Sequence, residues 1–220
     1  MSDTQYSILI VGVGGQGVLL ASELISHTAM RAGLDVKKSE VHGMSQRGGA
    51  VSSHVRMGSK VYSPTIEYGQ ADFLLAFEQA EGLRCLDWMK RDGLAIVSTT
   101  KLIPAIVTAS KTFTYPDDAI DQMKKKTNNV IAVEADQMAL ELGNPRLVNT
   151  ILLGVLSGHL PFPQEQWSET MQAKMKAKLV EINLRAFQRG REIPPVSSLQ
   201  CGHSISSIVL SSKTLCLPAQ

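Results

Sequence analysis

Residues 7–56, SILIVGVGGQGVLLASELISHTAMRAGLDVKKSEVHGMSQRGGAVSSHVR, decide the fold. The stretch reads as a strand, a glycine-rich turn, an amphipathic helix, a second strand, a second glycine-rich turn and a third strand. Residues 8–11 are a continuous apolar run of strand length, which is typical of a strand buried on both faces in a parallel sheet. Together these elements predict an α/β fold, a three-layer α/β/α sandwich with a mostly parallel, Rossmann-like sheet.

The first glycine-rich turn has the chemistry of an anion-binding loop. Glycine allows a strand to turn sharply into a helix, and the missing Cβ lets a ligand approach the backbone closely. The helix that follows would point unpaired N–H groups and a partial positive charge at that ligand, which favours phosphate or carboxylate. The candidate ligand-binding residues of this turn are Gly12, Gly14, Gly15, Gln16 and Gly17.

The same glycines leave two other interpretations open. Gly12, Gly14 and Gly17 satisfy the GxGxxG dinucleotide fingerprint, and Glu40 lies near the end of the second strand, where a ribose-binding acid is expected. A stand-alone nicotinamide or flavin oxidoreductase would use these four residues. Alternatively, the glycines serve only to pack the first helix against the sheet, with no ligand.

The second glycine-rich turn comes directly after the second strand and carries an arginine. A dinucleotide-binding unit would continue into a helix here, but residues 51–55 alternate like a strand. Two such turns at the ends of adjacent strands would face one crevice, and Arg47 would offer it a planar, permanently charged donor fork. A salt bridge within its own loop is the alternative for Arg47. The candidate residues of this turn are Ser45, Gln46, Arg47, Gly48 and Gly49.

These motifs resemble a known family. GVGGQG at 12–17, EVHGMSQRGGAVSSHVR at 40–56 and SPTIEYGQADFLLAFE at 63–78 are similar to the gamma-type domain of the 2-oxoacid:acceptor oxidoreductases. The HGMSQRGG form resembles the beta (small) subunit of the indolepyruvate:ferredoxin type. The resemblance extends from about Tyr6 to about Glu192, so we expect a gamma-type domain at 1–193. The serine-rich residues 194–220 depart from the family and form an atypical tail, for which disorder is one interpretation.

The resemblance implies a subunit rather than a complete enzyme. The implied reaction is the oxidative decarboxylation of indolepyruvate or other arylpyruvates to aryl-acetyl-CoA, with ferredoxin as electron acceptor. Thiamine diphosphate, Mg²⁺ and 4Fe–4S clusters are expected in a larger partner subunit, and coenzyme A is the expected co-substrate beside the glycine-rich turns. A purely structural subunit, whose glycines and Arg47 serve packing and docking, is the remaining alternative.

Composition excludes several other classes of protein. The formal charge of +2 is too small to predict a nucleic acid or a membrane surface as partner. No apolar run is long enough to span a bilayer, and residues 1–6 are too short and polar for a secretory signal, so we expect a cytoplasmic protein. Cys85, Cys201 and Cys216 are too far apart for a cluster or zinc motif, and we predict no metal site in this chain.

Three further expectations concern single elements. The apolar strand at 71–77 ends at Glu78, which we expect to cap the next helix rather than face the crevice. That helix is predicted over 79–91, with Cys85 as a small core residue. Asn149, on a strongly apolar helix, is expected to be hydrogen-bonded inside the fold or presented to a partner, since burying an unpaired amide is costly.

Overall fold

The computed structural model describes residues 5–42, 48–103 and 114–194, and six strands form one sheet in the order β2-β3-β1-β4-β5-β6. The strands are β1 (Tyr6–Val13), β2 (Asp35–His42), β3 (Ala50–Gly58), β4 (Ala71–Ala76), β5 (Met89–Ser98) and β6 (Val130–Val133). The helices are α1 (Val18–Arg31), α2 (Gln79–Arg84), α4 (Ala119–Lys126), α5 (Ala135–Glu141), α6 (Val148–Ser157), α7 (Gln164–Lys174) and α8 (Ala177–Arg191), with 3-10 turns η1 (Leu86–Trp88) and η2 (Pro145–Leu147). Most of the tail, residues 195–220, lies outside the described residues.

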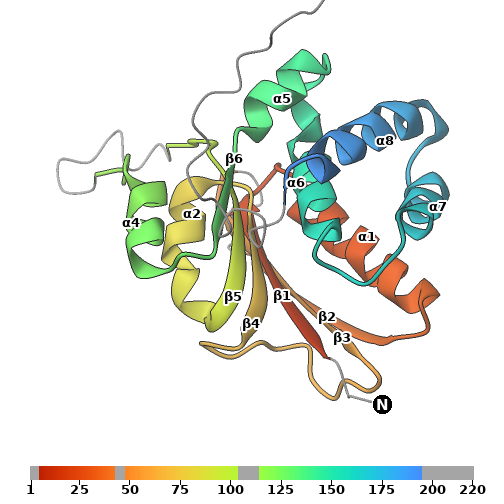
Figure 1. The fold of residues 1–220 in the computed structure, drawn as a ribbon, viewed down its shortest axis with the longest axis horizontal. Helices are drawn as coiled ribbons and strands as arrows, with labels where there is room; N and C mark the ends of the chain where they lie inside the picture. Colours follow the sequence, from red (N-terminus) through yellow and green to blue (C-terminus); the bar gives the residue numbers. More distant parts are fainter. Residues whose placement is uncertain (1–4, 43–47, 104–113, 195–220) are drawn as a thin grey trace, which may run out of the picture.

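Helices cover both faces of the sheet, as Figure 1 shows, and this confirms the predicted three-layer α/β/α arrangement. The alternation of side chains along β1 explains the layers. Ile8 and Ile10 pack into a cluster with α1, α6, α7 and α8, whereas Leu9 and Val11 pack with α2, η1 and α4 on the other face. Because a strand turns successive side chains to opposite faces, one uninterrupted apolar run supplies both cores.

The sheet is mostly parallel, as predicted, but β3 runs antiparallel to both of its neighbours, β1 and β2. The expectation that the two glycine-rich turns end adjacent strands is therefore wrong, because β3 lies between β2 and β1. β2 ends at the carboxyl edge of the parallel strands, and β3 starts there and runs back. The connection between β2 and β3 thus begins and ends at the edge where the first glycine-rich turn leaves β1.

The predicted helix over 79–91 is wrong in its length. α2 ends at Arg84, and the chain passes through η1 into β5, which begins at Met89. A tertiary contact stabilises the extended conformation, because Lys90 Nζ lies 2.5 Å from a carboxylate oxygen of Asp72 on the neighbouring strand. Cys85 is a buried core residue, as expected. Within the described ranges, we find no helix of the length and apolar character needed to cross a membrane.

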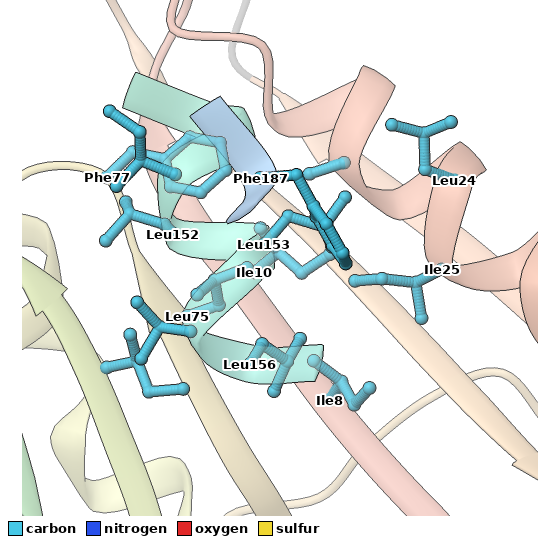
Figure 2. Packing of buried hydrophobic residues seen from close by; sticks show 14 of the residues in the cluster. Ile8, Ile10, Leu24, Ile25, Leu75, Phe77, Leu152, Leu153, Leu156 and Phe187 are labelled. Carbon is cyan, nitrogen blue, oxygen red and sulfur yellow. The ribbon is translucent and has the colours of Figure 1, made fainter. Parts of the chain in front are cut away.

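α6 is the central helix of the larger core and is buried along its whole length. Leu152, Leu153 and Leu156 face Ile8 and Ile10 of β1 in Figure 2, with Phe187 of α8 beside them. α8 crosses α6 at glycines on both helices. A Cβ on Gly154 would lie 2.1 Å from the Phe187 carbonyl oxygen, and one on Gly190 would lie 2.0 Å from the Ile151 carbonyl oxygen.

We expect Gly190→Ala to lower the free energy of unfolding by about 3 kcal/mol, because a methyl group cannot fit between the two backbones without separating the helices. Urea unfolding of the purified protein, followed by circular dichroism, measures the change. Gly158→Ala is the matched control, since its Cβ would approach only the Val155 carbonyl oxygen, at 3.4 Å. Equal stability of the two variants would contradict the packing described for α6 and α8.

Candidate functional site

The two glycine-rich turns meet at the carboxyl edge of the sheet. Gly14 N donates to Gly49 O at 2.8 Å, and Gly48 N donates to Gly14 O at 3.3 Å. The pair of backbone hydrogen bonds fixes the end of the second turn against the first. Ser45, Gln46 and Arg47 lie outside the described residues.

Gln16 joins the first turn to the end of β4. Its Oε1 accepts a hydrogen bond from Val13 N at 2.7 Å, and its Nε2 donates to Phe77 O at 2.9 Å. A Cβ on Gly12 would lie 2.8 Å from Gln16 Oε1, so a side chain at position 12 would displace the amide. Open α/β sheets bind ligands at the crevice between strands such as β1 and β4. Here Gln16 fills that crevice, and the diphosphate of a dinucleotide would have to displace it.

α1 begins with unsatisfied donors. Gly17, its N-cap residue, has a φ of 88°, and no side chain of the described residues caps the helix. The first turn also carries no acidic residue, so its N–H groups and partial positive charge are left for a ligand. A Cβ on Gly17 would lie 2.4 Å from Asn149 Nδ2, whereas one on Gly15, with a φ of 106°, would meet open space. The missing Cβ of Gly17 therefore leaves room for the Asn149 amide, and the missing Cβ of Gly15 leaves the backbone of the loop accessible.

Two pockets flank the start of α1. The first, which we call the loop pocket, has a volume of about 440 Å³ and lies between α1 and the ends of β2 and β3. Its lining is mostly apolar, with Val13, Leu19 and Val51, and it also includes Glu40 and His42. Glu40 is near the end of β2, as predicted, and its carboxylate lies 2.8 Å from Lys38 Nζ.

The second, the helix pocket, has a volume of about 470 Å³ and lies between the first turn and the segment that leads into α6. Arg146 and Asn149 line it. Asn149 is 7% exposed, and its Oδ1 lies 3.3 Å from the Thr150 hydroxyl, which in turn donates to Asn183 Oδ1 at 2.7 Å. The Thr150 hydroxyl hydrogen is shared between these two amide oxygens, so only the oxygen of Asn149 is hydrogen-bonded inside the fold, as one of the two expectations had it, while its nitrogen faces Gly17. Gly15, Gly17 and Leu20 line both pockets.

Glu78 caps α2, which confirms the expectation for this carboxylate. It is 1% exposed, and its Oε2 accepts a hydrogen bond from Glu81 N at 2.8 Å. Its Oε1 accepts from the Tyr115 hydroxyl and, at 3.5 Å, from Leu102 N. Burial raises the pKa of the Tyr115 hydroxyl, and the hydrogen bond to Glu78 raises it further. Both carboxylate oxygens of Glu78 thus accept hydrogen bonds within the fold, and the residue lines neither pocket.

Sequence reasoning missed Arg146, and it gave Asn149 no place beside the first turn. Both lie far from the turn along the chain, and only the packing of α6 against α1 brings them to the helix pocket. The sequence Asn144–Pro145 was the available signal for a helix start at this point. Asn144 Oδ1 caps η2 by accepting a hydrogen bond from Arg146 N at 3.0 Å. Across the described ranges, no three His, Cys, Asp or Glu side chains gather as a metal site.

Comparisons with known proteins found a matching family and related chains. Residues 7–193 match the family described as pyruvate ferredoxin/flavodoxin oxidoreductase. The chain is 43% identical over 188 residues to the indolepyruvate oxidoreductase subunit IorB of Archaeoglobus fulgidus, which covers 84% of this chain and 92% of that protein. The IorB subunit of Thermococcus kodakarensis is 39% identical over 84% of this chain and 94% of its own length.

Solved structures share the fold. The gamma subunit of a keto/oxoacid ferredoxin oxidoreductase from Geobacter sulfurreducens superposes with a TM-score of 0.63 at 24% identity, covering 85% of this chain and 96% of that one. The 2-oxoglutarate:ferredoxin oxidoreductase of Magnetococcus marinus, solved with 2-oxoglutarate, coenzyme A and succinyl-CoA bound, gives a TM-score of 0.65 at 21% identity. That match covers 90% of this chain and 32% of the longer one.

Replacing Gln16 by glutamate tests the amide bridge. We expect Gln16→Glu to lower the free energy of unfolding by about 2–4 kcal/mol at pH 7, because a carboxylate oxygen would face the Phe77 carbonyl oxygen. Folding should raise the pKa of the new carboxyl above its usual value of about 4.3, so the loss should shrink as pH falls toward that value. Urea unfolding at pH 7 and pH 5 measures this. Gln16→Ala, which cannot titrate, is the control, and an equal pH dependence in both variants would contradict the bridge.

Proposed function

Because the chain belongs to the pyruvate ferredoxin/flavodoxin oxidoreductase family, we propose that it is the small subunit of an indolepyruvate-type 2-oxoacid oxidoreductase. The observation that carries this proposal is the likeness to IorB subunits at 35–43% identity over more than nine-tenths of their length. In the proposed reaction, an arylpyruvate loses carbon dioxide, its acyl group forms a thioester with coenzyme A, and two electrons and one proton are released. Ferredoxin takes the electrons.

The redox and decarboxylation chemistry belongs to a larger partner subunit in this proposal. Thiamine diphosphate with Mg²⁺ would supply the decarboxylation, and 4Fe–4S clusters would carry electrons. Cys85 does not suit cluster ligation, because it is buried in the core and burial raises the pKa of its thiol to about 11. This chain therefore contributes to the reaction through binding and orientation.

Coenzyme A phosphate groups are the proposed ligands of the glycine-rich turns. The N–H groups of Gly15, Gly17 and the first turn of α1 would donate to the phosphates, since those of Gly14 and Gln16 already donate to Gly49 O and Val13 O. Arg47 directly precedes Gly48, whose N–H donates to Gly14 O, and in this proposal its guanidinium would join the turn in binding phosphate. Ser45 and Gln46 would add hydrogen bonds. Since Gln16 uses both ends of its amide inside the fold, its role is to hold the turn in shape.

The loop pocket suits the uncharged part of such a ligand. Its mostly apolar lining can accept a pantetheine arm or the aryl group of an acyl chain, while the phosphates remain at the helix start. Leu19 of α1, which lines the pocket, is 46% exposed, and Val41, which lies between the lining residues Glu40 and His42 on β2, is 58% exposed. A partner subunit that covers them would exclude water from the acyl group during thioester formation.

Isolation of the native complex is the direct test. We expect the tagged chain, purified without oxygen, to bring a larger brown subunit that contains thiamine diphosphate and iron–sulfur clusters. The complex should reduce a viologen dye only when an arylpyruvate and coenzyme A are both present. A chain that purifies alone and carries NAD or flavin would contradict the subunit proposal.

Arg47→Ala tests the phosphate role. We expect the apparent KM for coenzyme A to rise by roughly ten- to a hundredfold, because the variant loses the paired charge-assisted hydrogen bonds of one guanidinium. The complex should stay assembled. Arg47→Lys should recover only part of the affinity, because an ammonium lacks the planar fork. Arg31→Ala, which removes an exposed arginine paired with Glu169 at the other end of α1, is the matched control. An unchanged KM for coenzyme A in Arg47→Ala would refute the role.

A further inference from the structure

The helix pocket has a donor that the fold does not use. Asn149 is 93% buried, since 7% of it is exposed, and its Oδ1 faces the Thr150 hydroxyl. Its Nδ2 has no acceptor among the residues that the structure describes, and it points at the start of α1, 2.4 Å from where a Gly17 Cβ would lie. The nitrogen atom itself is not fully buried, so its N–H groups remain open to the pocket. A ligand oxygen in the pocket would satisfy one of them.

Two helices direct their amino ends at the same pocket. α1 begins at Val18 and α6 begins at Val148, and residues at both starts line the pocket. Neither helix has an acidic residue in its first turn. No described side chain caps α1, whereas α6 continues from η2, where the neutral Asn144 side chain accepts from Arg146 N. The partial positive charges of the two helix dipoles therefore add at this point. The geometry differs from a single helix start, because a buried amide and a second dipole converge with the first.

The charged side chains of the helix pocket are Arg146 and Asp136. The Arg146 guanidinium has no ion-pair partner among the described residues, and its charge is equal and opposite to that of Asp136. The loop pocket, by contrast, contains Glu40 and no arginine or lysine among its lining residues in the described ranges. The Glu40 carboxylate is paired with Lys38, so the side chains that line the loop pocket leave no free positive charge for a phosphate monoester, whereas the helix pocket offers Arg146 and two helix starts.

We propose that the helix pocket binds a phosphate monoester, held by Asn149 Nδ2, the Arg146 guanidinium and the first-turn N–H groups of α1. Resting on the proposed function, the monoester is the 3′-phosphate of coenzyme A. The diphosphate then lies over Gly15, whose missing Cβ leaves the ridge between the pockets open, and the pantetheine arm enters the loop pocket. The site thereby distinguishes coenzyme A from analogues that lack the 3′-phosphate.

Kinetics of the anaerobically purified complex with coenzyme A and with dephospho-coenzyme A test this proposal. The wild-type complex should show a KM for dephospho-coenzyme A roughly tenfold above that for coenzyme A. Arg146→Ala and Asn149→Asp should raise the KM for coenzyme A toward the dephospho value and change the dephospho KM far less. Asn149→Asp is nearly isosteric and replaces the donor by an anion, so its effect should exceed that of Asn149→Ala.

Two controls separate this site from the glycine-rich turns and from folding defects. Arg47→Ala should raise the KM of both substrates, since both carry the diphosphate, and Arg31→Ala should change neither. Inorganic phosphate should compete with coenzyme A in the wild-type complex and lose that effect in Arg146→Ala, an exposed position whose replacement leaves the core intact. Equal KM changes for the two substrates in Arg146→Ala and Asn149→Asp, or phosphate binding without competition, would overturn the proposal.

A complex that forms no acyl-CoA would refute the proposed function without deciding the pocket. In that case calorimetric titration of the same complex with inorganic phosphate decides it. Binding to the wild-type complex that is lost in Asn149→Asp and Arg146→Ala supports the phosphate site. No binding, or binding that both variants retain as an adventitious ion only, overturns it.

Discussion

The Gln16 amide is the contact on which the carboxyl edge of the sheet depends. It spans the gap between β1 and β4, taking one hydrogen bond from Val13 and giving one to Phe77. A neutral amide suits this place because it can accept at one end and donate at the other. With the crevice occupied in this way, the two pockets at the start of α1 lie on either side of the first turn.

The antiparallel strand β3 makes the topology of this sheet differ from that of a dinucleotide-binding unit. In a dinucleotide-binding unit the chain would leave β2 through a helix and return at the opposite edge. Here β3 starts at the carboxyl edge and pairs with β1 along its length. Gly48 and Gly49 therefore reach Gly14 through backbone hydrogen bonds, and the described end of the second turn lies against the first turn.

The helix pocket exists because helices pack closely behind the sheet. The glycines of α6 and α8 let their backbones approach, and α6 then lies fully buried between α8 and β1 (Figure 2). That position sets the amino end of α6 beside the amino end of α1. Asn149 is consequently held against Gly17 by the whole larger core, and a donor fixed in this way loses little entropy when it binds a ligand.

The sequence by itself determined those features that depend on neighbours along the chain. The apolar run at 8–11 specified a buried strand, the glycines after it specified the turn into α1, and Glu78 capped the helix that follows it. The paired motifs at 12–17 and 40–56 also indicated the family. These predictions succeeded because periodicity, capping and backbone freedom act over a few residues.

Only the tertiary structure decided the place of β3, the early end of α2, the internal use of Gln16 and the position of Arg146. Strand order depends on pairing between distant segments, and the Lys90 to Asp72 contact that favours β5 over a longer helix joins two strands. Gln16 could not be distinguished from a ligand-binding residue until Phe77 was seen beside it. Local patterns encode which residues can bind, but which of them remain free to do so depends on long-range contacts.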